Sequence, residues 1–210
     1  MKQASLIVSI LIAFIMTTRA DEKLSLKSPD GAIQVSINIG NFITYSVSYH
    51  NDLLFSNNKL ALNLKNENLG SPAKLLNSKI TAVSHTIKPH VPLKYSTVVS
   101  SFNKLLMSFK GNYAIEFRAF NDGIAYRFIT NKKGEVEVLN EQVDLNFPSS
   151  YDIHVQQPAS FKTAYEETYS TVNSANWNAK MSTLPVLIDT KKQYKILVSE
   201  SDLSDYPCLF

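Results

Sequence analysis

The sequence predicts an all-β protein, a large antiparallel β-sandwich with little helix. Apolar and polar residues alternate with a period of two through several short segments, and turn residues separate those segments. Between residues 24 and 200 no apolar pattern keeps the helical period of about 3.6 residues over three turns. Hydrophobic residues make up 44% and charged residues 19% of the chain, which is typical of a packed globular protein.

The first predicted elements form a β-hairpin. Apolar residues alternate through residues 33–39 and again through 43–49, and Gly40-Asn41 lies between the two runs. Glycine and asparagine tolerate the backbone angles that tight hairpin loops require. One face of this hairpin is therefore expected to be buried.

The same pattern recurs in the middle of the chain. Alternating segments at 105–109, 113–117 and 126–128 are separated by turn residues at 111–112 and 121–123. Several short strands at such spacing predict a sandwich. After a further turn at residues 131–134, the pattern continues through Val136, Val138, Val143, Leu145 and Phe147.

The remaining stretches are less regular. Residues 66–101, rich in Asn, Ser, Lys and Pro, predict edge strands and loops. Residues 148–182 are aromatic and polar without clear periodicity, so they predict long loops or a bent edge, where function tends to lie. Two more strands are expected at 186–188 and 194–198.

The N-terminal stretch, residues 1–20, predicts a secretory signal peptide. Lys2 precedes an apolar run from Leu6 to Met16, and small residues approach Ala20, after which cleavage is expected. The apolar run is short for a bilayer, which needs about 20 apolar residues, so an uncleaved anchor is the weaker alternative. Asp21 stands where a lipoprotein would carry its acylated cysteine. The protein is thus expected to be periplasmic or secreted, and not membrane-bound after cleavage.

Charge argues against nucleic-acid binding. Of the 21 basic residues, Lys2 and Arg19 lie in the signal, whereas all 18 acidic residues follow it, so the mature chain has a net charge of +1. No basic run remains that would neutralise several phosphates at once. Cys208 is the single cysteine, which excludes an intramolecular disulfide.

Few residues suggest chemistry by themselves. The sequence has no nucleophile elbow, phosphate-binding glycine loop or paired-cysteine zinc motif. Its four histidines have spacings that do not predict a metal site. Arg118 and Arg127 flank the turn at Asn121, and a structural role in ion pairs that tie loops together is the favoured interpretation.

Four residues are candidates for ligand binding. Trp177 is able to stack on a sugar ring, although a lone tryptophan more often packs in a β protein. Glu166 and Glu167, between Tyr165 and Tyr169, are able to hold a hydroxyl-rich ligand, although exposed glutamate pairs are often only solvated. Glu200 is either a turn carboxylate or a ligand of a hard cation such as Ca²⁺, which prefers oxygen ligands.

Four motifs in this order resemble a known family. They are SPDG at 28–31, YAIEFRAFNDGIAYRF at 113–128, YEETY at 165–169 and SESDLSDYP at 199–207. Together they resemble the N-terminal domain of glycoside hydrolase family 97, the α-glucosidase and α-galactosidase family. The resemblance runs from about Leu24 to Phe210.

The resemblance implies a galactose-mutarotase-like β-sandwich over residues 21–210, packed against a following (β/α)₈ barrel. That barrel carries the general acid and the base or nucleophile, and a barrel needs about 250 residues. The 210-residue chain does not contain it, so we expect no catalytic residue and no turnover by this chain alone. In the calcium-dependent members a glutamate of the N-terminal domain joins barrel glutamates around Ca²⁺, and Glu200 matches that position. Alone, the chain is expected to bind Ca²⁺ weakly.

One departure and two alternatives remain. The family pattern continues after DYP with Gly and Met, whereas this chain has Cys208 and Leu209. The first alternative function is a stand-alone carbohydrate-binding sandwich that uses Trp177 and the cluster from Tyr165 to Tyr169. The second is a purely structural domain of the export compartment.

Overall fold

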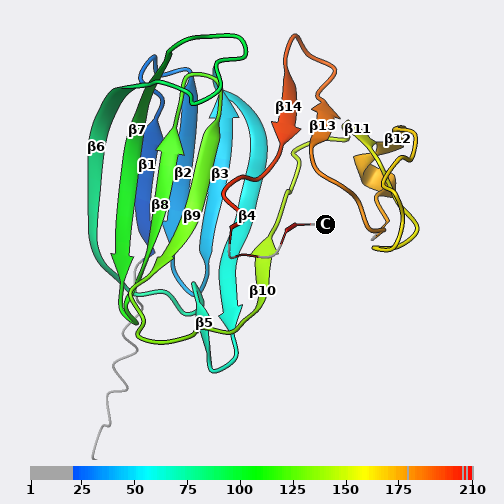
Figure 1. Ribbon diagram of the computed structural model, residues 1–210. Coiled ribbons are helices and arrows are strands. Elements are labelled where there is room, and N and C mark those ends of the chain that lie inside the picture. The colour runs from blue at the N-terminus through cyan, green and yellow to red at the C-terminus, as the bar shows by residue number, and fades with distance from the viewer. Residues whose placement is uncertain (1–20, 179, 205, 207, 210) are drawn as a thin grey trace, which may run out of the picture.

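The fold consists of three antiparallel sheets, two of which form a sandwich (Figure 1). A computed structural model describes residues 21–178, 180–204, 206, 208 and 209. The predicted signal peptide lies outside these residues. Over the described part of the chain we find no α-helix, and nothing helical has the length and apolarity needed to cross a membrane.

The first sheet contains the predicted N-terminal hairpin. Its order is β1-β2-β3-β4-β10, and the short strand β5 also pairs with β4. The hairpin register runs from Ile33 opposite Tyr49 to Ile39 opposite Ile43, as the alternating pattern predicted. The strands are β1 (Glu22–Lys27), β2 (Ile33–Ile39), β3 (Ile43–Tyr49), β4 (Asp52–Leu64), β5 (Glu67–Leu69) and β10 (Val138–Val143).

The second sheet is a meander in the order β6-β7-β8-β9. Its strands are β6 (Leu75–Ile87), β7 (Val98–Phe109), β8 (Tyr113–Ala119) and β9 (Ile124–Thr130). The predicted segments at 105–109, 113–117 and 126–128 all lie in it. Residues 66–101 contain β6, which lies at the edge of the sheet as predicted, although it is 13 residues long.

The two sheets enclose one core. Ile37 and Ile43 of the first sheet and Ile115 of the second are fully buried members of a single apolar cluster. The rings of Tyr45 and Phe117 meet across the sheets with centroids 5.6 Å apart. Burial alternates along β2 and β3, because successive side chains of a strand point to opposite faces. These observations confirm the predicted all-β sandwich.

The third sheet was not predicted as a unit. It has the order β12-β11-β13-β14, with β11 (Asp152–Val155), β12 (Ser170–Asn173), β13 (Val186–Asp189) and β14 (Lys195–Val198). A single-turn 3₁₀ helix, η1 (Ser174–Asn176), follows β12. Residues 148–182, expected to be loops or a bent edge, thus contribute β11 and β12. The strands expected at 186–188 and 194–198 are confirmed as β13 and β14, whereas DIHV and STVN, the sequences of β11 and β12, contain at most two apolar residues each, too few to show a period.

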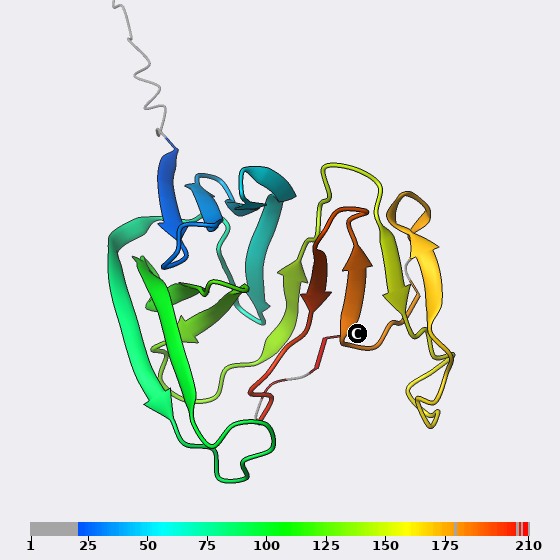
Figure 2. The same cartoon turned by 90° about the horizontal axis from the view of Figure 1, so that it is seen from above.

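This sheet stands beside the sandwich, with β14 nearest to it (Figures 1 and 2). It has a small core of its own, made of Tyr151, Ile153, Val155 and Ile188. Ile196 of β14 packs against both this core and that of the sandwich. Two apolar clusters that share side chains hold the three sheets together.

The motif EFRAFNDGIAYRF has a structural explanation. Glu116 of β8 points to the outer face of the second sheet, yet only 4% of its surface is exposed. The Arg118 guanidinium contacts Glu116 Oε1 through Nη2 at 2.6 Å, and that of Arg127 does so at 3.3 Å. The structural role predicted for both arginines is confirmed, but they join strands β8 and β9 instead of loops.

Candidate functional site

An open depression forms where the third sheet meets the C-terminal segment, by which we mean the described residues from Ser199 to Leu209. Its volume is about 440 Å³. One wall comes from the loop after β11, another from the residues before β13, and the third from the C-terminal segment. The lining residues are Gln156, Tyr165, Thr183, Leu184, Glu200, Cys208 and Leu209.

Hydrogen bonds join the first two walls. The Thr183 backbone N–H donates to the Gln156 carbonyl at 3.1 Å, and the Thr183 hydroxyl donates to Gln156 Oε1 at 3.3 Å. Gln156 Nε2 in turn donates to the carbonyl of Glu167 at 2.6 Å. Both ends of the Gln156 amide are therefore engaged, which fixes the loop that carries Tyr165 and its neighbours.

Glu200 supplies the carboxylate of the depression. It is half-buried, and its Oε1 accepts a hydrogen bond from the Leu209 backbone N–H at 2.8 Å. This bond closes the C-terminal segment on itself and turns the Glu200 carboxylate and Leu209 to the same depression. Cys208, the departure from the family pattern, is exposed.

The C-terminal segment is also tied to the sandwich. The Tyr206 hydroxyl donates to Glu141 Oε2 on β10 at 2.8 Å. Burial, followed by the hydrogen bond to the Glu141 carboxylate, raises the pKa of the Tyr206 phenol, and the charge of Glu200 acts in the same direction. The phenol therefore stays protonated and keeps donating throughout the physiological pH range.

The structure separates the predicted ligand-binding residues. Glu200 lines the depression, as does Tyr165 of the YEETY motif. Glu166 and Glu167 are exposed on the same loop, next to Tyr165 in the chain, and are not among the lining residues. Trp177 follows η1 with 42% of its surface exposed, so it is not a core residue, and it does not line the depression either.

The residues that sequence reasoning missed are the polar and apolar wall residues. Gln156 lies in the stretch 148–182, which had been expected to hold functional loops, but nothing in its neighbours distinguished it. Thr183 and Leu184 lie just beyond that stretch. They reach the site because the chain returns from η1 to β13 beside the loop after β11, a contact that the sequence does not encode locally.

The donor set of the depression limits how it could bind a metal. Within the described part of the chain, no three His, Cys, Asp or Glu side chains come together in a group suited to a metal ion. Glu200 provides one carboxylate, whereas Ca²⁺ takes about 6–8 oxygen ligands. Glu200 therefore fits Ca²⁺ only as one ligand of a site completed by other groups.

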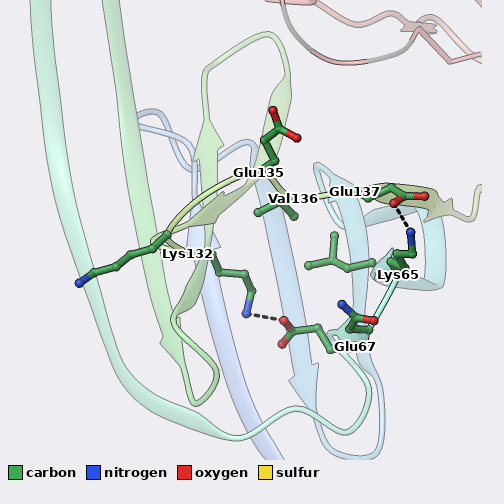
Figure 3. Close-up of a pocket in the computed structure, with 9 residues that line it drawn as sticks. Lys65, Glu67, Lys132, Glu135, Val136 and Glu137 are labelled. Carbon is green, nitrogen blue, oxygen red and sulfur yellow. Dashed lines mark hydrogen bonds and ion pairs between the residues drawn. The ribbon is translucent and has the colours of Figure 1, made fainter.

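A second pocket of about 300 Å³ lies between the β4–β5 turn and the loop before β10 (Figure 3). Lys65 Nζ pairs with Glu137 at 2.8 Å, and Lys132 Nζ pairs with Glu67 at 2.6 Å, as the figure shows. Lys133 and Glu135 also line it. Because three cations and three carboxylates offset one another, the pocket has no net charge that would select a charged ligand.

The structure thus defines a β-sandwich domain with a third sheet at its side and an open depression that carries the Glu200 carboxylate. Residues 26–210 match the family described as Glycosyl-hydrolase 97 N-terminal. The chain therefore belongs to the N-terminal domain family of glycoside hydrolase family 97, which the sequence motifs had predicted.

Several known proteins are similar to this chain in sequence or in fold. A retaining α-galactosidase of Bacteroides thetaiotaomicron is 31% identical over 206 residues, which cover 93% of this chain and 31% of that protein. Among solved structures, a β-arabinopyranosidase gives a TM-score of 0.73 at 21% identity and covers 85% of this chain and 31% of its own. A variant glycoside hydrolase family 97 enzyme from a Pseudoalteromonas species gives 0.68 at 20% identity, covering 80% and 27%. The chain thus spans less than a third of each relative.

Proposed function

We propose that this domain is the N-terminal part of an exported glycoside hydrolase that cleaves α-galactosidic or α-glucosidic bonds of oligosaccharides. The relative that is 31% identical, a retaining α-galactosidase, supports an α-galactoside as the first substrate to test. The observation that carries the proposal is the depression that contains Glu200, because it places a carboxylate and hydrogen-bonding groups on one open surface.

In this proposal the domain completes a substrate site and does not perform the reaction alone. Glycoside hydrolysis uses two carboxyl groups that flank the cleaved bond, and the resemblance assigns both to a catalytic barrel. The chain matches only 31% of the α-galactosidase, which leaves room for such a barrel in a longer protein. The isolated chain is expected to show no turnover of nitrophenyl α-galactoside or α-glucoside.

Glu200 is proposed as one Ca²⁺ ligand of the complete site. A calcium ion bound there would polarise oxygen atoms near the cleaved bond as a Lewis acid. Glu200 itself would hold one coordination position, and the Leu209 N–H on Oε1 would keep its carboxylate oriented. Weak Ca²⁺ binding by the isolated chain agrees with this role, whereas tight stoichiometric binding would contradict it.

The first experiment is the intact mass of the native protein, recovered from the source periplasm with an antibody against this chain. A mass several-fold above the 23.5 kDa of the chain is expected. In that protein Glu200→Gln should lower hydrolysis and Ca²⁺ affinity together, whereas Glu137→Gln at the charged pocket should change neither. Activity and Ca²⁺ affinity unaltered by Glu200→Gln would refute the role of Glu200.

A carbohydrate-binding module without hydrolysis is the second candidate. The exposure of Trp177, together with exposed Phe161 and Tyr169 on the loops of the third sheet, favours it. Oligosaccharide titration of the isolated chain separates the two proposals. Micromolar binding that disappears in Trp177→Ala would support the module, and a native mass slightly below 23.5 kDa would do the same.

A further inference from the structure

Glu141 accepts hydrogen bonds from two tyrosines that come from different parts of the fold. On one side, the Tyr126 hydroxyl of β9 donates to Oε1 at 3.1 Å. On the other, the Tyr206 hydroxyl of the C-terminal segment donates to Oε2 at 2.8 Å. The half-buried carboxylate of β10 therefore joins the edge of the second sheet, the first sheet and the C-terminal segment.

The sandwich holds Glu141 firmly. Glu141 pairs with Leu62 of β4 in the ladder of the first sheet. The Tyr126 ring packs against the rings of Tyr45 and Phe117, with centroids 6.0 Å and 5.7 Å away. Burial raises the pKa of the Tyr126 phenol, which therefore remains a donor. The Glu141 carboxylate is thus held on the core side by contacts that do not involve the C-terminal segment.

Tyr206 attaches the segment that carries Glu200 to Glu141. It lies in the chain between Glu200 and Leu209, whose N–H donates to the Glu200 carboxylate. The charge of Glu200 also contributes to the raised pKa of the Tyr206 phenol, as expected for groups that lie close together. The hydrogen bond from Leu209 to Glu200 therefore closes the segment on itself, and the hydrogen bond from Tyr206 to Glu141 attaches the closed segment to the sandwich.

We propose that Glu141 is a positioning residue for the Glu200 depression. By holding Tyr206, it sets where the C-terminal segment lies and hence where the Glu200 carboxylate points. This inference rests on the proposed role of Glu200 as a ligand within a glycosidase site, but it concerns a different part of the molecule, strand β10. If the bond only stabilised the sandwich, breaking it would lower global stability and leave the segment ordered in the folded state, whereas breaking a bond that positions the segment loosens the segment locally.

The two tyrosines provide matched variants. Tyr206→Phe removes the bond to the segment, and Tyr126→Phe removes the bond to the core from the same carboxylate. Backbone order parameters of the ¹⁵N-labelled protein report the mobility of the C-terminal segment and of the sandwich strands separately. In Tyr206→Phe and in Glu141→Ala, we expect the order parameters of the segment to fall from about 0.85 to below about 0.6, while those of β2 and β3 stay unchanged. The amides to follow are those of residues 199–204, 208 and 209.

Tyr126→Phe removes one core-side contact of Glu141 but keeps the bond to Tyr206, so it is expected to lower the order parameters of the segment less than Tyr206→Phe does. The double variant Glu141→Ala/Tyr206→Phe should lower them no further than either single variant, because both changes break one connection. An ordered segment in Tyr206→Phe, or equal loss in Tyr126→Phe, would overturn the proposal. If Glu141→Ala does not fold, Tyr206→Phe still decides.

The proposed function and the positioning role of Glu141 can be rejected independently of each other. The order parameters are measured without Ca²⁺ or sugar, so they test only the positioning. In the native protein, Tyr206→Phe should weaken Ca²⁺ affinity less than Glu200→Gln does. A disordered segment together with unchanged Ca²⁺ affinity in Glu200→Gln would retain the positioning by Glu141 and reject the ligand role of Glu200.

Discussion

Gly70 shows how one residue is specified by its surroundings. Its φ of +105° lies in the region that only glycine adopts readily. A Cβ atom built there would lie 2.6 Å from the backbone oxygen of Leu60, an atom of β4 that has no freedom to move aside. Backbone angle and space both exclude a side chain at the end of β5.

Replacing Gly70 with Ala should therefore destabilise the sandwich by about 1–3 kcal/mol, the usual cost of a strained backbone position. Urea unfolding followed by tryptophan and tyrosine fluorescence measures this. Gly123→Ala is the control, because a Cβ atom added to Gly123 would have nothing within 4 Å and the φ of Gly123 is not positive. Equal stability of the two variants would mean that the close approach to Leu60 is relieved elsewhere.

Glu116 carries a second residue-scale prediction. Its carboxylate is buried between two guanidinium groups, so Glu116→Gln leaves cations without their counter-charge in a partly desolvated place. We expect a loss of about 1–3 kcal/mol, since part of each arginine remains in contact with water. Glu137→Gln breaks the exposed pair with Lys65 and should cost less than about 1 kcal/mol. Similar urea midpoints for the two variants would contradict this ranking.

At the scale of elements, a small set of polar contacts joins the third sheet to the sandwich. Asp52, at the start of β4, accepts a hydrogen bond from the Tyr194 hydroxyl at 3.0 Å and pairs with Lys192 Nζ at 2.8 Å. The Tyr194 ring also meets the edge of Tyr49 with centroids 5.1 Å apart. Lys192 and Tyr194 lie just before β14, so these contacts attach the start of β14 to the start of β4 and thereby hold the third sheet against the sandwich.

Stability against acid should depend on this junction. The hydrogen bonds from Lys192 and Tyr194 hold the pKa of Asp52 below its ordinary value of 3.8. A lowered folded-state pKa contributes stability above 3.8 that disappears as the pH falls through the folded-state value. Asp52→Asn should therefore be less stable than wild type at pH 7, and the difference should shrink as the pH falls through and below 3.8.

Urea midpoints across this pH range measure the effect. Asp122→Asn, in the turn between β8 and β9, is the control for loss of one surface carboxylate. For Lys192 the pH dependence is reversed: its pKa is raised in the folded state, so the stability that its charge contributes is lost only as the pH rises into strong alkali. A constant difference between Asp52→Asn and wild type from neutral pH to about pH 2.5 would show that Asp52 contributes nothing through its charge.

The whole molecule has an exposed edge on the side away from the third sheet (Figure 2). Strand β6 pairs with β7 along one side only, and Leu76, Ile80 and Ile87 expose apolar side chains on it. Unpaired edge strands with exposed apolar residues favour association between chains. In a longer protein the same edge would be available for packing against other parts of the chain.

Association of the isolated chain should therefore rise with concentration, as light scattering would show. Ile80→Lys, which places a charge on the edge strand, is expected to reduce it. Leu197→Lys is the matched control, because Leu197 is similarly apolar and exposed but lies on β14. A monomeric wild-type protein at high concentration, or equal effects of the two variants, would argue against β6 as the associating edge.

Much of the sandwich follows from local sequence. The alternation from Ile33 to Tyr49 predicts a hairpin with one buried face, because strand geometry sends successive side chains to opposite sides and the core accepts only the apolar ones. The motifs that ended in SESDLSDYP also identified the family. These properties depend on neighbours within a few residues, or on a motif order that the chain itself displays.

The depression and its support were decided only by tertiary structure. Gln156, Thr183 and Glu200 line one surface because β13 returns between β11 and β14, and no spacing in the sequence signals that return. Glu141 and Tyr206 are 65 positions apart, and their hydrogen bond exists because the fold brings β10 beside the C-terminal segment. A periodic pattern encodes which face of a strand is buried, whereas the groups that meet at an edge depend on how separate sheets pack.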